Sequence, residues 1–486
     1  MSALVFKAGY LPGLTDDDVA WHRLSLGAPH APLQVDVPQL SLAQLTALAQ
    51  RVRQARQAHL ATLRVSEIVG VLDRAVARLL DVNDVYRQQL DLLLPQASGF
   101  DAEMVRLNLS AYLQTFRSLQ LQRFVAEDFA NPQLLDAFQP RSTGGWAKAF
   151  GPGLMVHVWA GNVPALPLWS FVSGLLVKAG SIGKIASAEP VFASVFARLL
   201  AEVEPCWADC FAVVWWQGGD AEQECHAFAL ADVVLAYGGN QALTAMQARA
   251  PVTTRFLPHG HKLSFGMVSC AALALRKGQA VARQAALDVA RYDQQGCYSP
   301  HVFYVQRGGA VSPQEFAQHL ASELAALHHK LARRSLTLEE AAQVNAWRQS
   351  HELAAIDDHS CIVLGHTAPW GTVVYTDQPH ALTPGPLNRC VVVAAVDALE
   401  DVVALIAPQR DFLQTVGLAV SPEEMLHFGE RLGQAGVTRI CAVGQMTSPE
   451  AGWHHDGRFS LLDLVRMVDI EASTEREAQR FTRYEL

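Results

Sequence analysis

A cysteine on a short polar loop is the residue in this sequence best suited to covalent chemistry. Cys297 follows Gln294-Gln295-Gly296 and lies between a segment with a helical pattern and an apolar segment typical of a strand. Such a loop leaves backbone amides free and gives access to the sulfur, which as a thiolate attacks carbonyl and thioester carbons. We therefore interpret Cys297 as a candidate nucleophile. The alternative is an inert loop cysteine.

The other seven cysteines are scattered along the chain, at positions 206, 210, 225, 270, 361, 390 and 441. Cys206, Cys210 and Cys225-His226 have residue types that bind metals, but their spacing matches no zinc pattern. We expect these thiols to be buried and to act as small hydrophobic side chains, so no metal site is predicted. Scattered cysteines in a chain of this size favour a reducing compartment, and we expect a cytoplasmic protein.

The composition narrows the class of protein further. The chain has 486 residues, of which 50% are hydrophobic and 17% charged, with a formal net charge of −9. This balance argues against a basic surface for nucleic acid. We expect no signal peptide, and no membrane span, because the longest apolar tract, 163–177, is short and contains Pro164, Pro167 and Gly174.

The elements that must position Cys297 follow an alternating pattern. We expect residues 1–35 to be irregular and residues 41–80 and 101–129 to form long helices. From Leu154 onward, short apolar segments alternate with helical ones, which predicts strands over 154–159, 182–185, 211–216, 232–237, 302–306, 361–364, 391–395 and 439–443. Helical crossovers between such strands give a mostly parallel sheet covered on both faces, and ligands bind beyond its carboxyl ends.

Four segments in this order resemble the aldehyde dehydrogenase superfamily, and most closely its acyl-CoA reductase branch, the LuxC-like fatty acyl-CoA reductases. They are Trp159-Ala-Gly-Asn162-Val-Pro164, Gly180-Ser-Ile-Gly-Lys184-Ile-Ala-Ser187, Tyr237-Gly238-Gly239-Asn240 and Gln294-Gln-Gly-Cys297. The tail segment Trp453-His-His-Asp456-Gly457-Arg458 also looks LuxC-like. The resemblance covers about residues 150–471.

The resemblance implies an aldehyde dehydrogenase-like α/β fold, with two α/β domains of mostly parallel sheets and a small oligomerisation element. The implied domains are a helical N-terminal region with the dinucleotide-binding domain over 1–258, a catalytic domain carrying the cysteine over 259–429, and a C-terminal segment over 430–486 that returns to the dinucleotide-binding or oligomerisation region. A homo-oligomer is expected by analogy.

The resemblance also assigns roles to individual residues. Cys297 would form the covalent acyl-enzyme, and Asn162 would donate, with the backbone N–H of the nucleophile, to the oxyanion of the tetrahedral intermediate. The alternative for Asn162 is a turn residue that stabilises its own loop. The histidines His259, His261 and His301 are candidate bases for the thiol, although solvated or packed histidines are the simpler interpretation for each.

Four further residues are implied to bind a dinucleotide. Lys184 would contact the adenosine ribose, and Gly238 and Gly239 would let the backbone approach the cofactor at a strand–helix turn. Many NAD-preferring relatives carry a glutamate where this chain has Ser187. A serine removes the repulsion against a 2′-phosphate, so NADPH is favoured over NADH. Tight turns without a ligand, and a surface lysine, are the alternatives.

Two carboxylates of the aldehyde-oxidising relatives are missing from this sequence. The stretch His259–Gly266 has no counterpart of the glutamate that activates water, and Leu382 stands near the position of a second glutamate. Without a water base, the acyl group should stay on the cysteine until hydride arrives. We therefore predict NADPH-dependent reduction of an acyl-CoA, or another acyl thioester, to an aldehyde.

Two other functions stay open at this stage. One is an NAD(P)-dependent aldehyde dehydrogenase that oxidises aldehydes to acids with an unrecognised base. The other is a non-catalytic subunit that serves an acyl-transferring protein partner. The segment Asp456-Gly457-Arg458 would close the site or form a subunit contact, or it is a plain charged turn.

Overall fold

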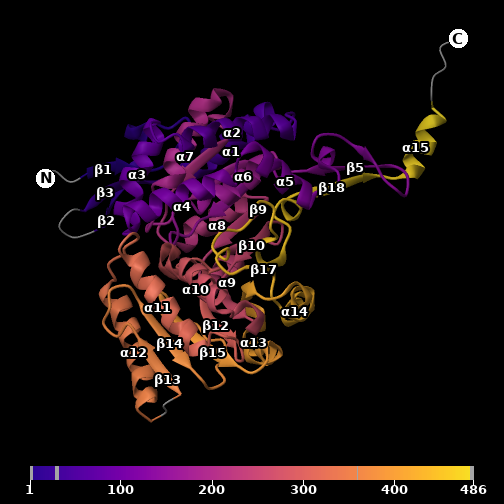
Figure 1. Cartoon of the computed structure of the whole chain (residues 1–486). Helices are drawn as coiled ribbons and strands as arrows, with labels where there is room; N and C mark the ends of the chain where they lie inside the picture. The colour runs from indigo at the N-terminus through magenta and orange to yellow at the C-terminus, as the bar shows by residue number, and fades with distance from the viewer. Residues whose placement is uncertain (1–3, 28–31, 358–359, 482–486) are drawn as a thin grey trace.

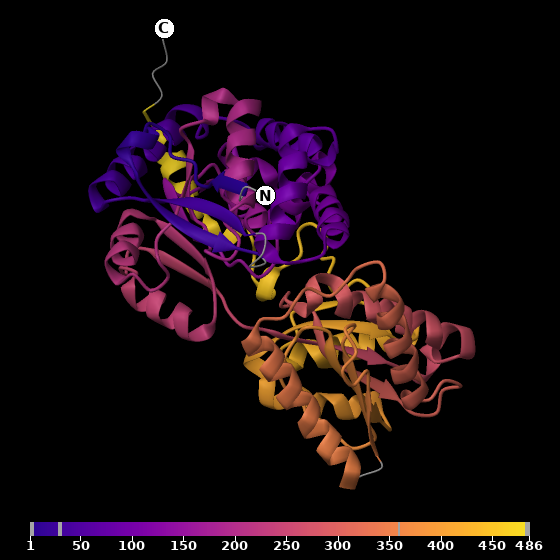
Figure 2. The ribbon, with the colours of Figure 1, turned by 90° about the vertical axis from the view of Figure 1, so that its left-hand side faces the viewer.

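Two layered α/β units form the body of the molecule, and a narrow arm extends from one of them (Figure 1). The structure is a computed structural model and describes residues 4–27, 32–357 and 360–481. In the view turned by 90° the two units stand apart, and the chain crosses between them (Figure 2). The predicted α/β architecture with mostly parallel sheets is confirmed.

The first unit is built on a five-stranded parallel sheet with the order β10-β9-β6-β7-β8. Successive residues of its strands pack into different cores: Met155 faces helices α6 and α7, whereas Leu154 and Val156 face α1, α8 and α9. Coverage on both faces explains why the strands are apolar throughout. The elements are β6 (Leu154–Val158), α6 (Pro167–Leu176), β7 (Gly180–Lys184), α7 (Phe192–Val203), β8 (Phe211–Val214), α8 (Ala221–Leu230), β9 (Val233–Tyr237), α9 (Asn240–Arg249) and β10 (Arg255–His259).

The strand order reverses between β6 and β9. From β6 the chain moves outward on one side through β7 and β8, and then returns to add β9 and β10 on the other side. A crevice forms at the carboxyl ends of the two strands where the direction changes. The segment after β6 carries Asn162, and the turn after β9 carries Gly238 and Gly239, so the topology brings these residues to one place.

The second unit is built on a seven-stranded sheet with the order β13-β14-β15-β12-β11-β16-β17, parallel except for β13. Helices α10 and α11 cover one face, and α13 and α14 cover the other. The elements are β11 (Leu263–Val268), α10 (Leu275–Ala290), β12 (Pro300–Gln306), α11 (Pro313–His328), α12 (Leu338–Asp357), β13 (Cys361–Leu364), β14 (Thr372–Thr376), β15 (Cys390–Val396), α13 (Val402–Ile406), β16 (Leu413–Ala419), α14 (Pro422–Ala435) and β17 (Arg439–Ala442).

The carboxyl edge of the first sheet faces the amino edge of the second. Strand β10 ends at His259, and β11 begins at Leu263, so a three-residue link joins the two edges. Cys297 lies just before β12, at the amino edge of the second sheet. Cys297, the candidate nucleophile, therefore lies opposite the crevice of the first sheet.

The prediction that residues 1–35 are irregular is wrong. They contribute a three-stranded sheet of β1 (Leu4–Lys7), β2 (Ala20–Leu26) and β3 (Leu33–Gln39). The alternation in β3 gives the reason, because Leu33, Val35 and Val37 are fully buried while Gln34 and Asp36 are less so. The prolines in this part of the chain masked the period-2 pattern.

The two long helices predicted near the N-terminus are each divided. Residues 41–80 form α1 (Leu42–His59) and α2 (Val65–Leu80), and residues 101–129 form α4 (Ala102–Gln114) and α5 (Ser118–Asp128), with α3 (Val85–Ser98) between the pairs. The second break is fixed by Asp73, which accepts from the backbone N–H of Ser118 at 2.7 Å and pairs with Arg117. A carboxylate at a new helix start satisfies amides that have no partner within the helix.

The arm is an antiparallel sheet of β4 (Gln139–Pro140), β5 (Trp146–Phe150) and β18 (Arg466–Ile470), which ends in α15 (Ala472–Gln479) (Figure 1). It joins two segments that are far apart in the sequence. Among the described residues, no helix combines the length and the apolar character needed to cross a membrane.

Candidate active site

A cavity of about 650 Å³ lies between the two units. Its wall includes the segment after β6, the turn after β9, the β10–β11 link, the loop before β12 and a C-terminal segment over 447–456. Cys297, Asn162, Gly238 and Gly239 all line it, whereas Lys184 and Ser187 do not. The structure thus brings four of the six predicted site residues to one cavity.

The loop that carries Cys297 is held in an uncommon backbone conformation. Tyr292, Asp293 and Gln294 have φ angles of 45°, 49° and 64°, in the left-handed region that non-glycine residues rarely adopt. Asp293 pairs with Arg389 at 2.6 Å, and both side chains are fully buried. The amide of Gln294 bonds to Cys390 through both its oxygen, at 2.8 Å, and its nitrogen, at 3.1 Å. These contacts fix the loop against the start of β15.

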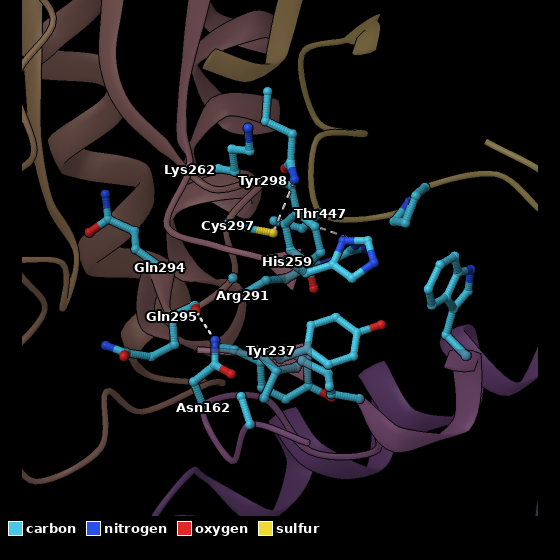
Figure 3. Close-up of a pocket in the computed structure, with 18 of the residues that line it drawn as sticks. Asn162, Tyr237, His259, Lys262, Arg291, Gln294, Gln295, Cys297, Tyr298 and Thr447 are labelled. Atoms are coloured by element: carbon cyan, nitrogen blue, oxygen red, sulfur yellow. Dashed lines mark hydrogen bonds between the residues drawn. The ribbon is translucent and has the colours of Figure 1, made fainter. Parts of the chain in front are cut away.

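The thiol of Cys297 is half-buried and touches one polar side chain. The Gln414 side chain donates from Nε2 to Sγ at 3.4 Å, as Figure 3 shows by a dashed line. Burial and the negative charge of Asp456 raise the pKa of the thiol to about 11, against the lowering effect of the Gln414 hydrogen bond. Cys297 is therefore a neutral thiol at neutral pH, and it must lose a proton as it attacks.

Asn162 lies across the cavity from the thiol and is tied to the nucleophile loop. Its Nδ2 donates to the backbone carbonyl of Gln295 at 2.7 Å (Figure 3). A primary amide carries two N–H groups, so one remains for a ligand. The bond also joins the segment after β6 to the loop of Cys297.

Gly238 and Gly239 leave room at the crevice of the first sheet. A Cβ atom at Gly239 would meet nothing within 4 Å, and at Gly238 the nearest atom would lie 3.8 Å away. Gly239 directly precedes helix α9, whose N-terminal amides favour a negatively charged group. Protein packing alone does not demand these glycines, so the space they leave fits a ligand.

Lys184 is the last residue of β7 and Ser187 follows it closely, and neither residue lines the cavity. Lys184 is only 7% exposed, and its ammonium has no hydrogen-bond or ion-pair partner among the described residues. Burial lowers its pKa, while the charge of Glu224 opposes that shift. The Ser187 hydroxyl accepts from the indole N–H of Trp215 at 3.0 Å and keeps its own proton to donate. A buried, unpartnered cation is suited to the hydroxyls of a ribose.

A polar cluster beside the thiol was not predicted. His259 Nδ1 lies 2.8 Å from Asp456 Oδ2, and Gln414 Nε2 lies 2.7 Å from Asp456 Oδ1. These contacts hold the pKa of Asp456 well below its usual range despite burial. Asp456 is therefore more than a charged turn. The sequence contained one signal for Gln414, because a glutamine interrupts an apolar strand pattern at 413–419.

The three histidines that were weighed as bases differ in their surroundings. His259 is in the cluster, whereas His301 is buried and accepts from the backbone N–H of Gly385 at 3.0 Å. His261 is exposed at the cavity wall. Only His259, of these three, is oriented by a carboxylate.

Candidate metal ligands occur in the same cluster. One ligand atom each of His259, His455 and Asp456 lies within 4.8 Å of the others. The two imidazoles are stacked, with centroids 4.5 Å apart and planes at 11°. Their lone pairs therefore lie in nearly parallel planes, which is a poor arrangement for two ligands of one ion, and Nδ1 of His259 already bonds to Asp456. Of the cysteines expected to be buried near residue 210, Cys210 is buried but Cys206 and Cys225 are exposed, so that prediction was wrong for two of them.

The cavity wall, over the part of the chain that the structure describes, contains one carboxylate, Asp456. Both of its oxygens accept hydrogen bonds, from Gln414 and from the His259 ring. Leu382, near the position of the second missing glutamate, is buried away from the cavity. No free carboxylate therefore faces the sulfur of Cys297.

Solved structures share the fold of this chain. Lactaldehyde dehydrogenase from Escherichia coli matches with a TM-score of 0.73 at 14% identity, over 96% of this chain and 99% of that one. A variant of aldehyde dehydrogenase C from Pseudomonas syringae, in complex with NAD+ and octanal, matches with a TM-score of 0.70 at 13% identity, over 96% of each chain. The expectation of an aldehyde dehydrogenase-like fold is confirmed.

Sequence comparisons identify the branch. The long-chain acyl-protein thioester reductase of Aliivibrio fischeri is 28% identical over 380 residues, which cover 77% of this chain and 75% of that protein. The protein of the same name from Photorhabdus luminescens is 26% identical over 391 residues, covering 79% and 78%. The profile of the acyl-CoA reductase (LuxC) family matches residues 60–467, well over half of the chain. The predicted resemblance is confirmed: this chain belongs to the LuxC family of acyl-CoA reductases.

Proposed function

We propose that this protein reduces an acyl thioester to an aldehyde, that Cys297 carries the acyl group, and that NADPH is the reductant. Family membership supports the overall reaction. The observation that carries the cysteine mechanism is the composition of the cavity wall: it includes the Cys297 thiol, and the one carboxylate among its described residues is already engaged by two hydrogen bonds. An acyl group on Cys297 would thus meet no free carboxylate to activate water.

In the first step Cys297 attacks the thioester carbon. As the S–C bond forms, the S–H group gives up the proton that the departing thiolate later takes up, and the carbonyl oxygen becomes an oxyanion. The free N–H of Asn162 and the backbone N–H of Cys297 are the donors we assign to that oxyanion; such a donor contributes about 3–4 kcal/mol of barrier lowering. The donor thiolate then leaves and takes up a proton, and a thioester to Cys297 remains.

The second step releases the product. A reduced nicotinamide dinucleotide, held by the residues that we assign on the first sheet, would supply the hydride that reduces the acyl carbon. The chain's own part is to hold that carbon at the nucleophile loop, which the buried Asp293–Arg389 pair keeps rigid. The Cys297 sulfur then leaves as thiolate, regains its proton, and the aldehyde is free.

The residues that would hold the dinucleotide lie on the first sheet. We assign Lys184 to the adenosine ribose, Gly238 and Gly239 to the pyrophosphate at the start of α9, and Ser187 to a 2′-phosphate. The unpartnered ammonium of Lys184 and the empty space at Gly239 fit such a ligand. Because Ser187 carries no charge, NADPH is preferred over NADH.

We also propose the cellular setting. The protein acts in the cytoplasm as a homo-oligomer assembled through the arm, and it receives its acyl group from coenzyme A or from an acyl-transferring protein partner. The relatives named acyl-protein thioester reductases favour a protein donor as one of the two sources.

Aldehyde oxidation is the second candidate, and the His259–Asp456 pair is the observation that favours it. A histidine oriented by a carboxylate is a recognised arrangement for a general base.

Single-turnover acylation separates the two functions. We expect acyl-CoA without NADPH to label Cys297, the adduct to persist, and added NADPH to release aldehyde. Cys297→Ala is the control. Rapid release of free acid from the labelled enzyme would contradict the reductase mechanism.

A further inference from the structure

Cys297 is the end of a chain of buried polar contacts drawn from three parts of the fold. Gln414 on β16 donates to its sulfur at 3.4 Å and to Asp456 Oδ1 at 2.7 Å. Asp456, on the C-terminal segment, receives His259 Nδ1 at 2.8 Å on its other oxygen. Gln414 is fully buried, and Asp456 and His259 are nearly so.

The carboxylate determines which end of the Gln414 amide faces the sulfur. An ionised carboxylate only accepts hydrogen bonds, and the amide donates only from Nε2. With Nε2 shared between Asp456 and Cys297, both of its N–H groups are used. A flipped amide would place its oxygen against the carboxylate and the sulfur, where two acceptors repel each other and a thiolate gains no stabilisation.

The position of Asp456 is itself fixed. His259, its partner, stacks with two rings, Tyr237 with centroids 4.9 Å apart and His455 with centroids 4.5 Å apart. These two ring contacts limit how far the imidazole can turn, and its Nδ1 stays directed at the carboxylate. Each contact in the series from His259 through Asp456 and Gln414 to the sulfur therefore has a fixed donor and a fixed acceptor.

We propose that Gln414 is a positioning residue that orients the sulfur of Cys297 and stabilises its thiolate, and that Asp456 and His259 fix the orientation of Gln414. The proposal rests on the proposed function in one respect, namely that Cys297 is the residue that carries the acyl group. The reactivity of the thiol can nevertheless be measured without any substrate.

The charges around the sulfur set the direction of the expected change. The titratable groups that face it are Asp456, Tyr237 and Tyr298, and among them Asp456 carries the negative charge at neutral pH. The Gln414 hydrogen bond opposes the effect of that charge on the pKa of Cys297. If the donor is removed while Asp456 stays, the thiol should become harder to ionise.

The test is the pH dependence of alkylation of Cys297 by iodoacetamide, followed by mass spectrometry of the peptide that contains it. Peptide-level detection is needed because Cys206, Cys225 and Cys270 are exposed. For Gln414→Met we expect the midpoint to rise by roughly one to two pH units, and the rate below the midpoint to fall by about 10- to 100-fold. Gln414→Glu places an acceptor against the sulfur and should raise the alkylation midpoint further.

Tyr304→Phe is the matched control. It removes one buried hydrogen bond, to the carbonyl of His380 at 3.0 Å, from strand β12 of the same sheet, and it does not touch Cys297. We expect its alkylation midpoint to equal that of the wild type. Circular dichroism of each variant verifies that it is folded.

An unchanged midpoint in both folded Gln414 variants would overturn the positioning role. If Gln414→Met fails to fold, the polar, similarly sized Gln414→Glu decides the matter alone. Failure of the proposed function looks different: the wild type would form no aldehyde from any acyl thioester, while the alkylation midpoint would still depend on Gln414.

Discussion

Two opposing influences act on the sulfur of Cys297. The Gln414 amide favours the thiolate, whereas burial and the charge of Asp456 favour the neutral form. A thioester is also neutral at sulfur, so surroundings that disfavour the thiolate favour the acylated enzyme. A thiolate with a raised pKa is also a poorer leaving group. The site is thereby suited to retaining an acyl group until a strong donor such as hydride arrives.

The role proposed for Asn162 gives the first prediction. Asn162→Ala removes the free amide donor and also the bond to the carbonyl of Gln295. We expect kcat/KM for aldehyde formation to fall by about 10²–10³-fold, because a lost oxyanion donor acts on the transition state. Steady-state kinetics with an acyl-CoA measures this fall. A loss confined to KM, with kcat unchanged, would instead indicate a binding role.

Cofactor preference gives the second prediction. In Ser187→Glu a carboxylate replaces a hydroxyl near the ribose site that we propose, where it would repel a 2′-phosphate and accept from ribose hydroxyls. We expect the ratio of kcat/KM for NADPH to that for NADH to fall at least about tenfold. Ser187→Ala, which adds no charge, should change the ratio far less. A wild-type enzyme that prefers NADH would contradict the assignment of Ser187.

A part of the site can be predicted from sequence when its residues lie in one short segment, and not when it depends on contacts between distant segments. Cys297 and Asn162 stand in short recognisable segments, and the structure brings both to the cavity. Gln414, Asp456 and His259 come from parts of the chain up to 197 residues apart, and their contacts exist only once both sheets are folded. Hydrogen bonds between distant segments leave no periodic trace in a sequence, so this network could not be predicted.

At the level of elements, the nucleophile loop depends on a second loop. The start of β15 is preceded by Leu387, Asn388 and Arg389, which have φ angles of 59°, 56° and 62°. A run of left-handed residues thus packs against the run at 292–294, and the pair Asp293–Arg389 joins them. Such backbone costs about 1–3 kcal/mol per residue and persists only where surrounding contacts hold it.

That dependence gives the third prediction. Arg389→Met leaves the carboxylate of Asp293 buried without its partner, which should lower the free energy of unfolding by about 3–5 kcal/mol. Urea denaturation measures the change. Arg283→Met is the control, since Arg283 is 61% exposed where it pairs with Glu323 and its loss should cost at most about 1 kcal/mol. Equal losses in the two variants would contradict the bracing role of Arg389.

Element boundaries show where sequence patterns stop being informative. The strand predicted at 361–364 matches the structure at both ends. The helices over 41–80 and 101–129 were predicted without their breaks, because a tertiary contact, Asp73 to Ser118, creates the second one. Periodicity marks the buried face of a helix but does not reveal where a distant side chain ends it.

On the scale of the whole molecule, the arm is the part that projects away from the two α/β units (Figure 1). Its strands β5 and β18 pair with each other, in register from Phe150 opposite Arg466 to Trp146 opposite Ile470. Trp146 and Met467 are exposed on it. A projecting sheet with apolar side chains is typical of a surface that another chain covers.

The fourth prediction follows from this shape. Val468→Pro removes a backbone donor from β18 and should disrupt the arm without affecting the two main sheets. We expect light scattering to report a smaller particle than the wild type, with thermal unfolding of the body retained. Val468→Thr, which keeps the strand, is the control. An unchanged molar mass for a disrupted arm would show that assembly, if present, uses another surface.

The two crossings of the chain between the units have a mechanical consequence. One crossing is the link after His259, and the other lies between Val443 and Leu461, which belong to the cores of different units. Each crossing contributes one partner to the His259–Asp456 bond. A hydrogen bond thus joins the two chain crossings to each other beside the sulfur of Cys297. Any separation of the units at these two links would stretch this bond, so we expect opening of the cavity to change the reactivity of the Cys297 thiol.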